Sequence, residues 1–189
     1  TAVGSSLYFR SYVGTDGTEL WKSDGTSSGT VMVKDINSGS TSSSPNYLTA
    51  VGSTLYFMAS DGTNGYELWK SDGTSSGTVM VKDINSGSSS SSLDHLTAVG
   101  NTLYFSATDG TNGAELWKSD GFSSSTMMVE DINSETGGTG DSNPAFPPDI
   151  VVTVDLRAND GTNGPKPSKS DGTTRRPGTR TCLRTPSAQ

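Results

Sequence analysis

The stretch "ELWKSDGTSSGTVMVKDINSGS" occupies residues 19–40 and returns without a single change at residues 67–88. A third copy, "ELWKSDGFSSSTMMVEDINSE", begins at Glu115. The flanking motifs keep the same spacing, since "TAVG" begins at Thr1, Thr49 and Thr97. A single active site needs one set of catalytic groups, so triplication points to another use. The sequence therefore predicts tandem repeats, with units that start near residues 1, 49 and 97.

Each unit reads as short β-strands separated by turns. In the second unit, apolar and aromatic residues predict strands at residues 46–51, 54–59, 66–71 and 78–84. The Asn64–Gly65 pair is typical of a tight hairpin, because both residue types tolerate positive φ. No helical periodicity is found in the chain.

Four short antiparallel strands in a unit of this length match the size of one propeller blade. A sheet this small cannot bury both of its faces alone, whereas a stack of such sheets can. Leu55 and Phe57 are expected to face one neighbour, and Tyr56 and Met58 the other. The sequence predicts an all-β fold, a propeller-like array of 48-residue units. A β-solenoid and a linear string of small sheets are the alternative architectures.

The letters "ELWKSDGTSSGTVMVKDI" resemble the ELWxxDGT repeat of large bacterial secreted and surface proteins. The resemblance covers about residues 1–135, and the third unit departs from it at Phe122 and Ser125. It implies an extracellular β-repeat protein located outside the cell or on a bacterial surface. It brings no catalytic residues to this chain.

Charge is distributed unevenly along the chain. Residues 1–156 carry 6 basic and 18 acidic side chains, whereas residues 157–189 carry 7 basic and 2 acidic ones. The acidic body disfavours nucleic acids and anionic membranes as partners. The single cysteine, Cys182, excludes an intrachain disulfide. No apolar run is long enough for a membrane-spanning helix.

The repeat breaks down after Ser134. "ANDGTNG" at residues 158–164 is a repeat fragment that three extra residues have displaced. "PKPS" then stands where "ELW" is expected, and proline disfavours sheet pairing. Residues 1–147 are thus predicted to hold three repeats. Residues 148–189 are predicted to be a degenerate or frameshifted fourth repeat that forms a disordered tail.

Three tryptophans, Trp21, Trp69 and Trp117, occupy one position in every unit. Because tryptophan carries a large apolar area, the position is interpreted as core between neighbouring units. The alternative is an exposed aromatic platform in each unit, on which sugars stack. That alternative makes the protein a multivalent, lectin-like carbohydrate-binding propeller.

Four "SDG" motifs place Asp24, Asp72, Asp120 and Asp171 in equivalent loops. Calcium requires several oxygen ligands that converge, and each of these loops has a single carboxylate. An aspartate before glycine accepts main-chain hydrogen bonds in a turn, which is the role predicted here. Calcium binding is the alternative, and no other cofactor is expected.

The remaining polar residues yield no catalytic set. The Glu and Lys of "ELWK" are interpreted as a solvated strand edge, and an ion pair across strands is the alternative. The Ser/Thr tracts at residues 38–45 and 86–92 are interpreted as flexible linkers and, in an exported protein, as O-glycosylation sites. The only histidine, His95, aligns with Tyr47 of the preceding unit.

These observations predict a non-catalytic extracellular repeat scaffold, structural, adhesive or self-assembling. Three blades cannot close a propeller ring, so self-association or further repeats of a longer chain are the expected partners. Leu55, Phe57, Leu103 and Phe105 are expected near the contacts that close the stack. Glycans are a second class of partner, whereas nucleic acid and membrane insertion are not expected.

Overall fold

The computed structural model describes residues 1–133, 140–145, 154–161 and 164–170, and these contain β-strands and no helix. Three antiparallel sheets of four strands follow one another along the chain, each with its strands paired in sequence order. The first sheet comprises β1 (Ala2–Val3), β2 (Ser6–Val13), β3 (Gly17–Ser23) and β4 (Val31–Lys34). The second comprises β5 (Asn46–Val51), β6 (Thr54–Ser60), β7 (Tyr66–Ser71) and β8 (Val79–Lys82). The third comprises β9 (Asp94–Val99), β10 (Thr102–Thr108), β11 (Ala114–Ser119) and β12 (Met127–Glu130). The all-β prediction with four short strands in a unit is confirmed.

The pairing register repeats from sheet to sheet. In the second sheet β6 pairs with β7 from Leu55↔Ser71 to Ser60↔Tyr66. In the third sheet β10 pairs with β11 at the equivalent positions, from Leu103↔Ser119 to Thr108↔Ala114. A register shift interrupts the next ladder between Leu and Trp of the "ELW" motif in all three sheets. Identical letters therefore produce identical strand pairing.

The turn between β6 and β7 differs in detail from the prediction. It is a five-residue loop, Asp61–Gly65, rather than a two-residue turn with positive φ at both positions. Gly62 and Gly65 adopt positive φ (82° and 69°), whereas Asn64 does not. The carboxylate of Asp61 accepts hydrogen bonds from the main-chain N–H groups of Thr63 and Asn64 (2.9 Å each) and closes the loop.

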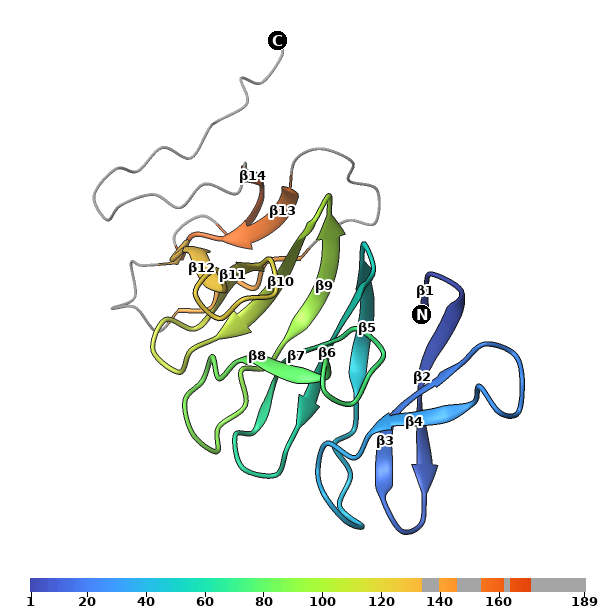
Figure 1. The fold of residues 1–189 in the computed structure, drawn as a ribbon. Helices are drawn as coiled ribbons and strands as arrows, with labels where there is room; N and C mark the ends of the chain where they lie inside the picture. Colours follow the sequence, from blue (N-terminus) through green and yellow to red (C-terminus); the bar gives the residue numbers. More distant parts are fainter. Residues whose placement is uncertain (134–139, 146–153, 162–163, 171–189) are drawn as a thin grey trace.

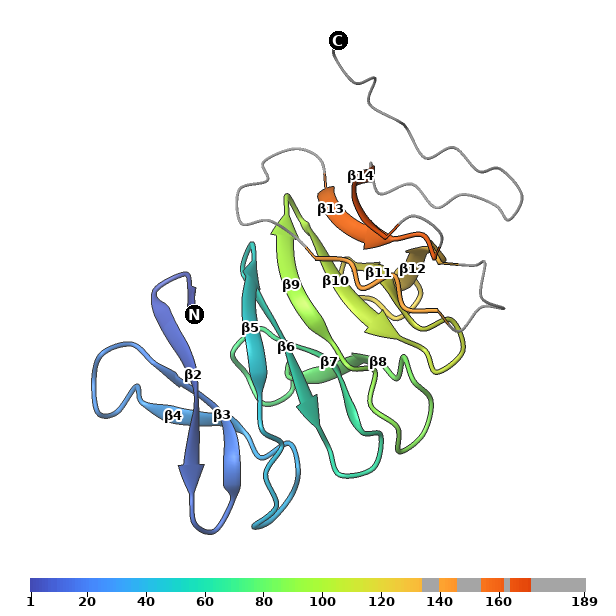
Figure 2. The same cartoon turned by 180° about the vertical axis from the view of Figure 1, so that it is seen from behind.

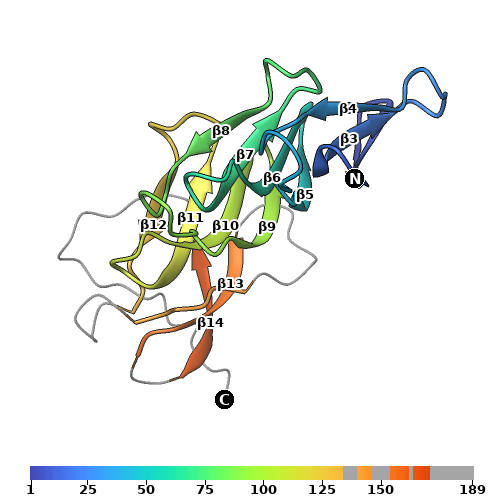
Figure 3. The same cartoon turned by 90° about the horizontal axis from the view of Figure 1, so that it is seen from below.

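Consecutive sheets stack face to face, as Figures 1 and 3 show. We call the side of a sheet that packs on the following unit its donating face, and the side that packs on the preceding unit its receiving face. At the first junction, the buried donating residues are Tyr8, Leu20, Val33 and Ile36, and the buried receiving residues are Leu55, Phe57, Ala59 and Trp69. At the second junction, they are Tyr56, Leu68, Val81 and Ile84 against Leu103, Phe105, Ala107 and Trp117.

The four apolar side chains expected at the contacts that close the stack lie at these internal junctions. They are Leu55, Phe57, Leu103 and Phe105, each 0% exposed. Neighbouring units of the same chain already cover them. They are therefore not available to a partner molecule.

A strand pair follows the third sheet. It comprises β13 (Val154–Asn159) and β14 (Pro165–Ser170), which pair from Val154↔Ser170 to Asn159↔Pro165. This is the register of β6 and β7, with β13 at the place of β6 and β14 at the place of β7. These two strands lie within the segment predicted to be a disordered tail, while residues 146–153, 162–163 and 171–189 lie outside the described part of the chain.

The prolines of β14 are tolerated because of the direction in which their nitrogens point. At Thr18 and Tyr66, which are equivalent to Pro165, the main-chain N–H donates to a serine hydroxyl of the following linker and not to the hairpin partner. Pro167 lies two residues further on, so its nitrogen points to the same side of the strand. Both prolines therefore leave the pairing with β13 intact.

The stack is open. Figures 1 and 2 show the first sheet at one end, the β13–β14 pair at the other, and β5 beside β9 in the middle. The sheets do not close into a ring. Among the described residues there is no helix with the length and apolar character needed to cross a membrane.

Candidate functional site

The repeated tryptophans lie at the junctions between sheets. Trp69 is 6% exposed and Trp117 is 5% exposed, and both belong to the core clusters described above. Trp21, in the first unit, is only partly buried. Two of the three positions are therefore covered by a neighbouring unit and present no aromatic surface to a sugar.

The repeated aspartates close their own turns. Asp72 Oδ1 accepts hydrogen bonds from the main-chain N–H (2.8 Å) and the hydroxyl (2.7 Å) of Thr74. Asp24 makes the same two bonds with Thr26. These bonds, led by the one from the threonine hydroxyl, hold the pKa of both carboxyls below the usual value.

The third aspartate departs slightly from this pattern. Asp120 Oδ1 accepts from the Phe122 N–H (3.2 Å) and from the Ser125 hydroxyl. The side-chain bond from Ser125 is the main cause of the lowered pKa of Asp120. In the described part of the chain, no three His, Cys, Asp or Glu side chains gather as a set able to hold a metal ion.

The glutamates of "ELW" are buried, contrary to the prediction of a solvated edge. Glu19, Glu67 and Glu115 are each 0% exposed. A carboxylate costs much free energy to bury unless hydrogen bonds replace its water. The partners of these three groups therefore decide how the units are built.

Glu19 binds the chain that leaves its own sheet. Its Oε2 accepts from the Ile36 N–H (2.9 Å), just after β4. Its two oxygens also accept from Ser43, Oε1 from the main-chain N–H (2.7 Å) and Oε2 from the hydroxyl (2.5 Å). We call this arrangement the Glu–Ser clamp.

The clamp recurs in the third unit. Glu115 accepts from the Ile132 N–H (3.0 Å), and from the N–H (3.1 Å) and hydroxyl (2.7 Å) of Ser142. In the second unit, Glu67 accepts from the Ile84 N–H (2.9 Å), while its Oε1 has no hydrogen-bond partner among the described residues.

Burial raises the pKa of all three glutamates. The pKa of Glu67 and that of Glu115 each rise to about 7. Desolvation outweighs the hydrogen bonds, which act in the opposite direction. Asp83 beside Glu67 and Asp131 beside Glu115 raise the pKa further by charge repulsion. The carboxyls of Glu67 and Glu115 thus gain and lose protons near neutral pH.

The clamp serine also reaches the next sheet. Its carbonyl oxygen accepts a hydrogen bond from the last residue of β6, β10 or β13 in the following unit. The three bonds run from Ser60 N to Ser43 O (3.1 Å), from Thr108 N to Ser91 O (2.9 Å), and from Asn159 N to Ser142 O (3.0 Å). Ser43 and Ser91 are 0% exposed, and Ser142 is 1% exposed. The Ser/Thr tracts are therefore not free linkers along their whole length.

Lysines complete the junctions. Lys34 Nζ of the first unit donates to Thr78 O (2.9 Å) and lies 6.0 Å from the centroid of the Trp69 ring. Lys82 of the second unit repeats both contacts, with Thr126 O (2.8 Å) and the Trp117 ring (5.8 Å). The lysine of "ELWK" contributes as well, since Lys22 Nζ donates to Gly73 O (2.8 Å). These cations join successive units rather than lining a solvated edge.

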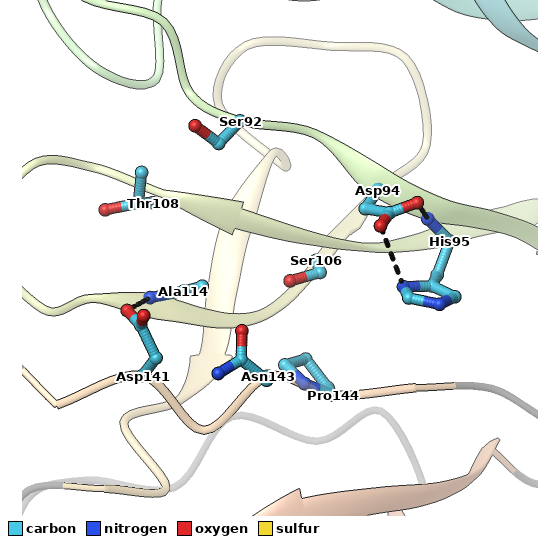
Figure 4. Close-up of a pocket in the computed structure, with 9 residues that line it drawn as sticks. All are labelled: Ser92, Asp94, His95, Ser106, Thr108, Ala114, Asp141, Asn143 and Pro144. Atoms are coloured by element: carbon cyan, nitrogen blue, oxygen red, sulfur yellow. Dashed lines mark hydrogen bonds and ion pairs between the residues drawn. The ribbon is translucent and has the colours of Figure 1, made fainter.

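A cavity of about 320 Å³ opens in the third unit, where the connection to the fourth repeat passes β9, β10 and the start of β11 (Figure 4). It is lined by Ser92, Asp94, His95, Ser106, Thr108, Ala114, Asp141, Asn143 and Pro144. From this set sequence reasoning names His95, without a role, and Ser92 as part of the Ser/Thr tract at residues 86–92.

The cavity exists because the third unit has small residues where the second has large ones. Ser106 and Ala114 stand at the repeat positions that Met58 and Tyr66 occupy in the second unit. Pro144, with the three-residue insertion counted, stands at the position of Leu93. The cavity is thus a property of the third unit and not of the repeat.

The cavity is polar and acidic. Asp94 lies 3.6 Å from His95 Nδ1, and Asp141 Oδ1 accepts from the Ala114 N–H (2.8 Å). Ser106 is 5% exposed, and in Figure 4 its hydroxyl points away from the His95 ring. Carboxylates, hydroxyls and an amide suit a polyhydroxylated ligand, whereas a nucleophile aligned with His95 is not seen among these residues.

Comparison with known proteins adds no relative: no protein-family model matches the chain, and a search of curated proteins finds no significant match.

Proposed function

We propose that the protein is a non-catalytic repeat scaffold with a propeller-like arrangement of sheets, displayed outside a bacterial cell. The observation that carries the proposal is the repeated junction. The junctions between the first and second units and between the second and third units each combine an apolar layer, a lysine that crosses to the next unit, and a serine bonded on both sides. Such devices hold sheets in a fixed relation and leave no concentration of reactive groups. They suit a structural or adhesive role.

The propeller-like arrangement rests on two features of the stack. The sheets succeed one another with the same face forward, and the first strands β5 and β9 lie side by side. Blades around an axis have this relation, whereas the coils of a β-solenoid share continuous sheets. Further repeats, or copies of the chain, would be needed to extend the array.

Surface labelling of the native bacterium tests the proposal. A membrane-impermeant amine reagent applied to intact cells is expected to modify partly exposed lysines of this protein, such as Lys70. A cytoplasmic protein serves as the control and remains unmodified. If the protein is labelled only after the cells are lysed, the extracellular scaffold is excluded.

The third-unit cavity favours a second candidate function, the binding of a saccharide. This differs from a lectin with a tryptophan platform in every unit, because Trp69 and Trp117 are buried. Titration calorimetry with a panel of mono- and disaccharides is expected to give one site for each chain. The number of sites separates the two kinds of lectin.

A matched variant sharpens this test. The substitutions S106M and A114Y restore the residues that the second unit has at the same positions, and the second unit folds with them. The variant is expected to keep the fold and lose the saccharide. Unchanged binding in this variant would rule the cavity out as the site.

A further inference from the structure

The first unit presents a receiving face that no other part of the described chain covers. Leu7 is 53% exposed, whereas its equivalents Leu55 and Leu103 are 0% exposed. Phe9 is partly exposed, although Phe57 at the same position is completely buried. Leu and Phe stand at these two positions in all three units, so the missing neighbour accounts for the difference in exposure.

The polar half of the receiving face is also open. Thr78 and Thr126, whose carbonyl oxygens accept the crossing lysines, are 0% and 1% exposed, whereas Thr30 at the same position is exposed. A Cβ built on Gly73 would lie 2.2 Å from the hydroxyl oxygen of Tyr8, while one built on Gly25 would meet nothing within 4 Å. The Leu, Phe, Thr and Gly positions of a receiving face are thus present on the first unit without a neighbouring unit against them, while Ser11 stands where Ala59 and Ala107 lie in the buried faces.

We propose that this face binds the donating face of a further repeat of the same type, placed ahead of the first unit. The inference rests on the proposed scaffold function and names its partner. The partner must offer a tyrosine for the space above Gly25, a lysine for Thr30 O, and an apolar layer for Leu7 and Phe9. The donating faces of the first two units offer all three.

A second copy of this chain is a poor occupant. Its first two donating faces are already engaged, and Ala158 of β13 packs on the third. The third face also has Glu130 where the others have Lys34 and Lys82. A carboxylate cannot donate to a carbonyl oxygen, so the lysine contact with Thr30 O is lost. The donor is therefore a repeat with lysine at this position.

A fusion tests the proposal on the full chain. A copy of residues 49–96 is joined directly ahead of Thr1, which keeps the period of the repeat. Hydroxyl-radical footprinting then reports on Leu7 and Phe9, whose peptide differs in sequence from those of the other units. Their oxidation is expected to fall from the rate of exposed side chains to that of Leu103 and Phe105.

The matched control is the same fusion with Y56S and K82E in the added copy. The third unit folds with Glu130, so the lysine change is compatible with the unit, and circular dichroism checks the β-content of both fusions. The control is expected to leave Leu7 and Phe9 reactive. Equal protection in both fusions, or protection in neither, would overturn the proposal.

Sedimentation velocity on the chain without the added copy completes the test. A monomer with reactive Leu7 and Phe9 is expected. A dimer in which these two residues are protected would identify a second copy as the occupant and would overturn the proposal. None of these outcomes depends on where the protein resides, so the surface-labelling experiment judges the scaffold function independently.

Discussion

The carboxylate of Glu19 accepts hydrogen bonds from both the main-chain N–H and the hydroxyl of Ser43, 24 residues further along the chain. The carbonyl of Ser43 in turn accepts from Ser60 in the next sheet. One serine therefore fixes the path of the chain between two sheets. A buried glutamate contacts the chain at the exit from each of the three four-stranded sheets.

The substitution Ser43→Ala is expected to destabilise the protein by about 1–3 kcal/mol, because it removes a donor from a buried carboxylate. Chemical denaturation monitored by tryptophan fluorescence measures the change. Ser40→Ala, at an exposed position of the same tract, is the control and should stay within about 0.5 kcal/mol of the parent. Equal effects of the two substitutions would show that the clamp adds nothing to stability.

Stability is expected to fall as the pH rises from about 4.5 to above 7. Glu67 and Glu115 have a folded-state pKa of about 7, above the ordinary value of 4.5, so the folded chain binds more protons than the unfolded chain in this window. Their stabilising contribution is complete below 4.5 and is lost as the pH passes 7. The displacement corresponds to roughly 3 kcal/mol for each group.

Urea unfolding at a series of pH values measures this dependence. The variant E115Q cannot ionise at this position, so its stability should decline less steeply over the same range. The aspartates with lowered pKa, such as Asp72, act in the opposite sense and at lower pH, where stability is lost as they gain protons. A parent and a variant with parallel pH profiles would contradict the assignment.

Trp69→Ala is expected to cost about 3–5 kcal/mol, since it empties a space between two sheets. Trp69→Phe should cost less, because the indole N–H has no hydrogen-bond partner among the described residues and little beyond packing is lost. Trp21→Ala is the control, with a smaller effect because Trp21 is only partly buried. Thermal and urea denaturation of the three variants provide the comparison. A Trp69→Ala variant as stable as the parent would remove the residue from the core.

O-glycosylation, if the exported protein carries it, is expected only on the exposed part of each Ser/Thr tract. Ser38, Ser40 and Thr41 are exposed, whereas Ser43 and Ser91 are 0% exposed and hydrogen-bonded. Peptide mass spectrometry of protein from its native source should therefore place hexose before Ser43 and not on it. A sugar on Ser43 would require the clamp to be open when the modification occurs.

The strands and the buried tryptophans could be predicted because apolar residues recur at a fixed period, which indicates strands and core positions. The burial of Glu19 could not, because a carboxylate is ordinarily exposed and its partner Ser43 lies far along the chain, beyond β4. The signal was present, however, as a serine that follows each "ELW" at nearly constant distance. The cavity near Ser106 was missed for a different reason, since it arises from what the third unit lacks relative to the second.

The β13–β14 pair shows a limit of residue propensity. Pro165 and Pro167 argue against a strand when each is considered alone. Their spacing of two residues nevertheless directs both nitrogens to one side, and the register inherited from the repeat places β13 on the other side. The side of β14 that pairs with β13 therefore decides that the strand can form. This side can be recognised only when the β13–β14 hairpin is aligned with the equivalent hairpins of the other units, such as β6–β7.

The third clamp closes over a longer connection than the first, because Ser142 still meets Glu115 after a three-residue insertion. The fourth repeat nevertheless begins in phase, with its hairpin in the same register as the others. The contact between Glu115 and Ser142 fixes the point at which the connection ends. An insertion before Ser142 therefore does not shift the strand pairing of the next sheet. Connections of different length can therefore join repeats whose strand pairing is the same.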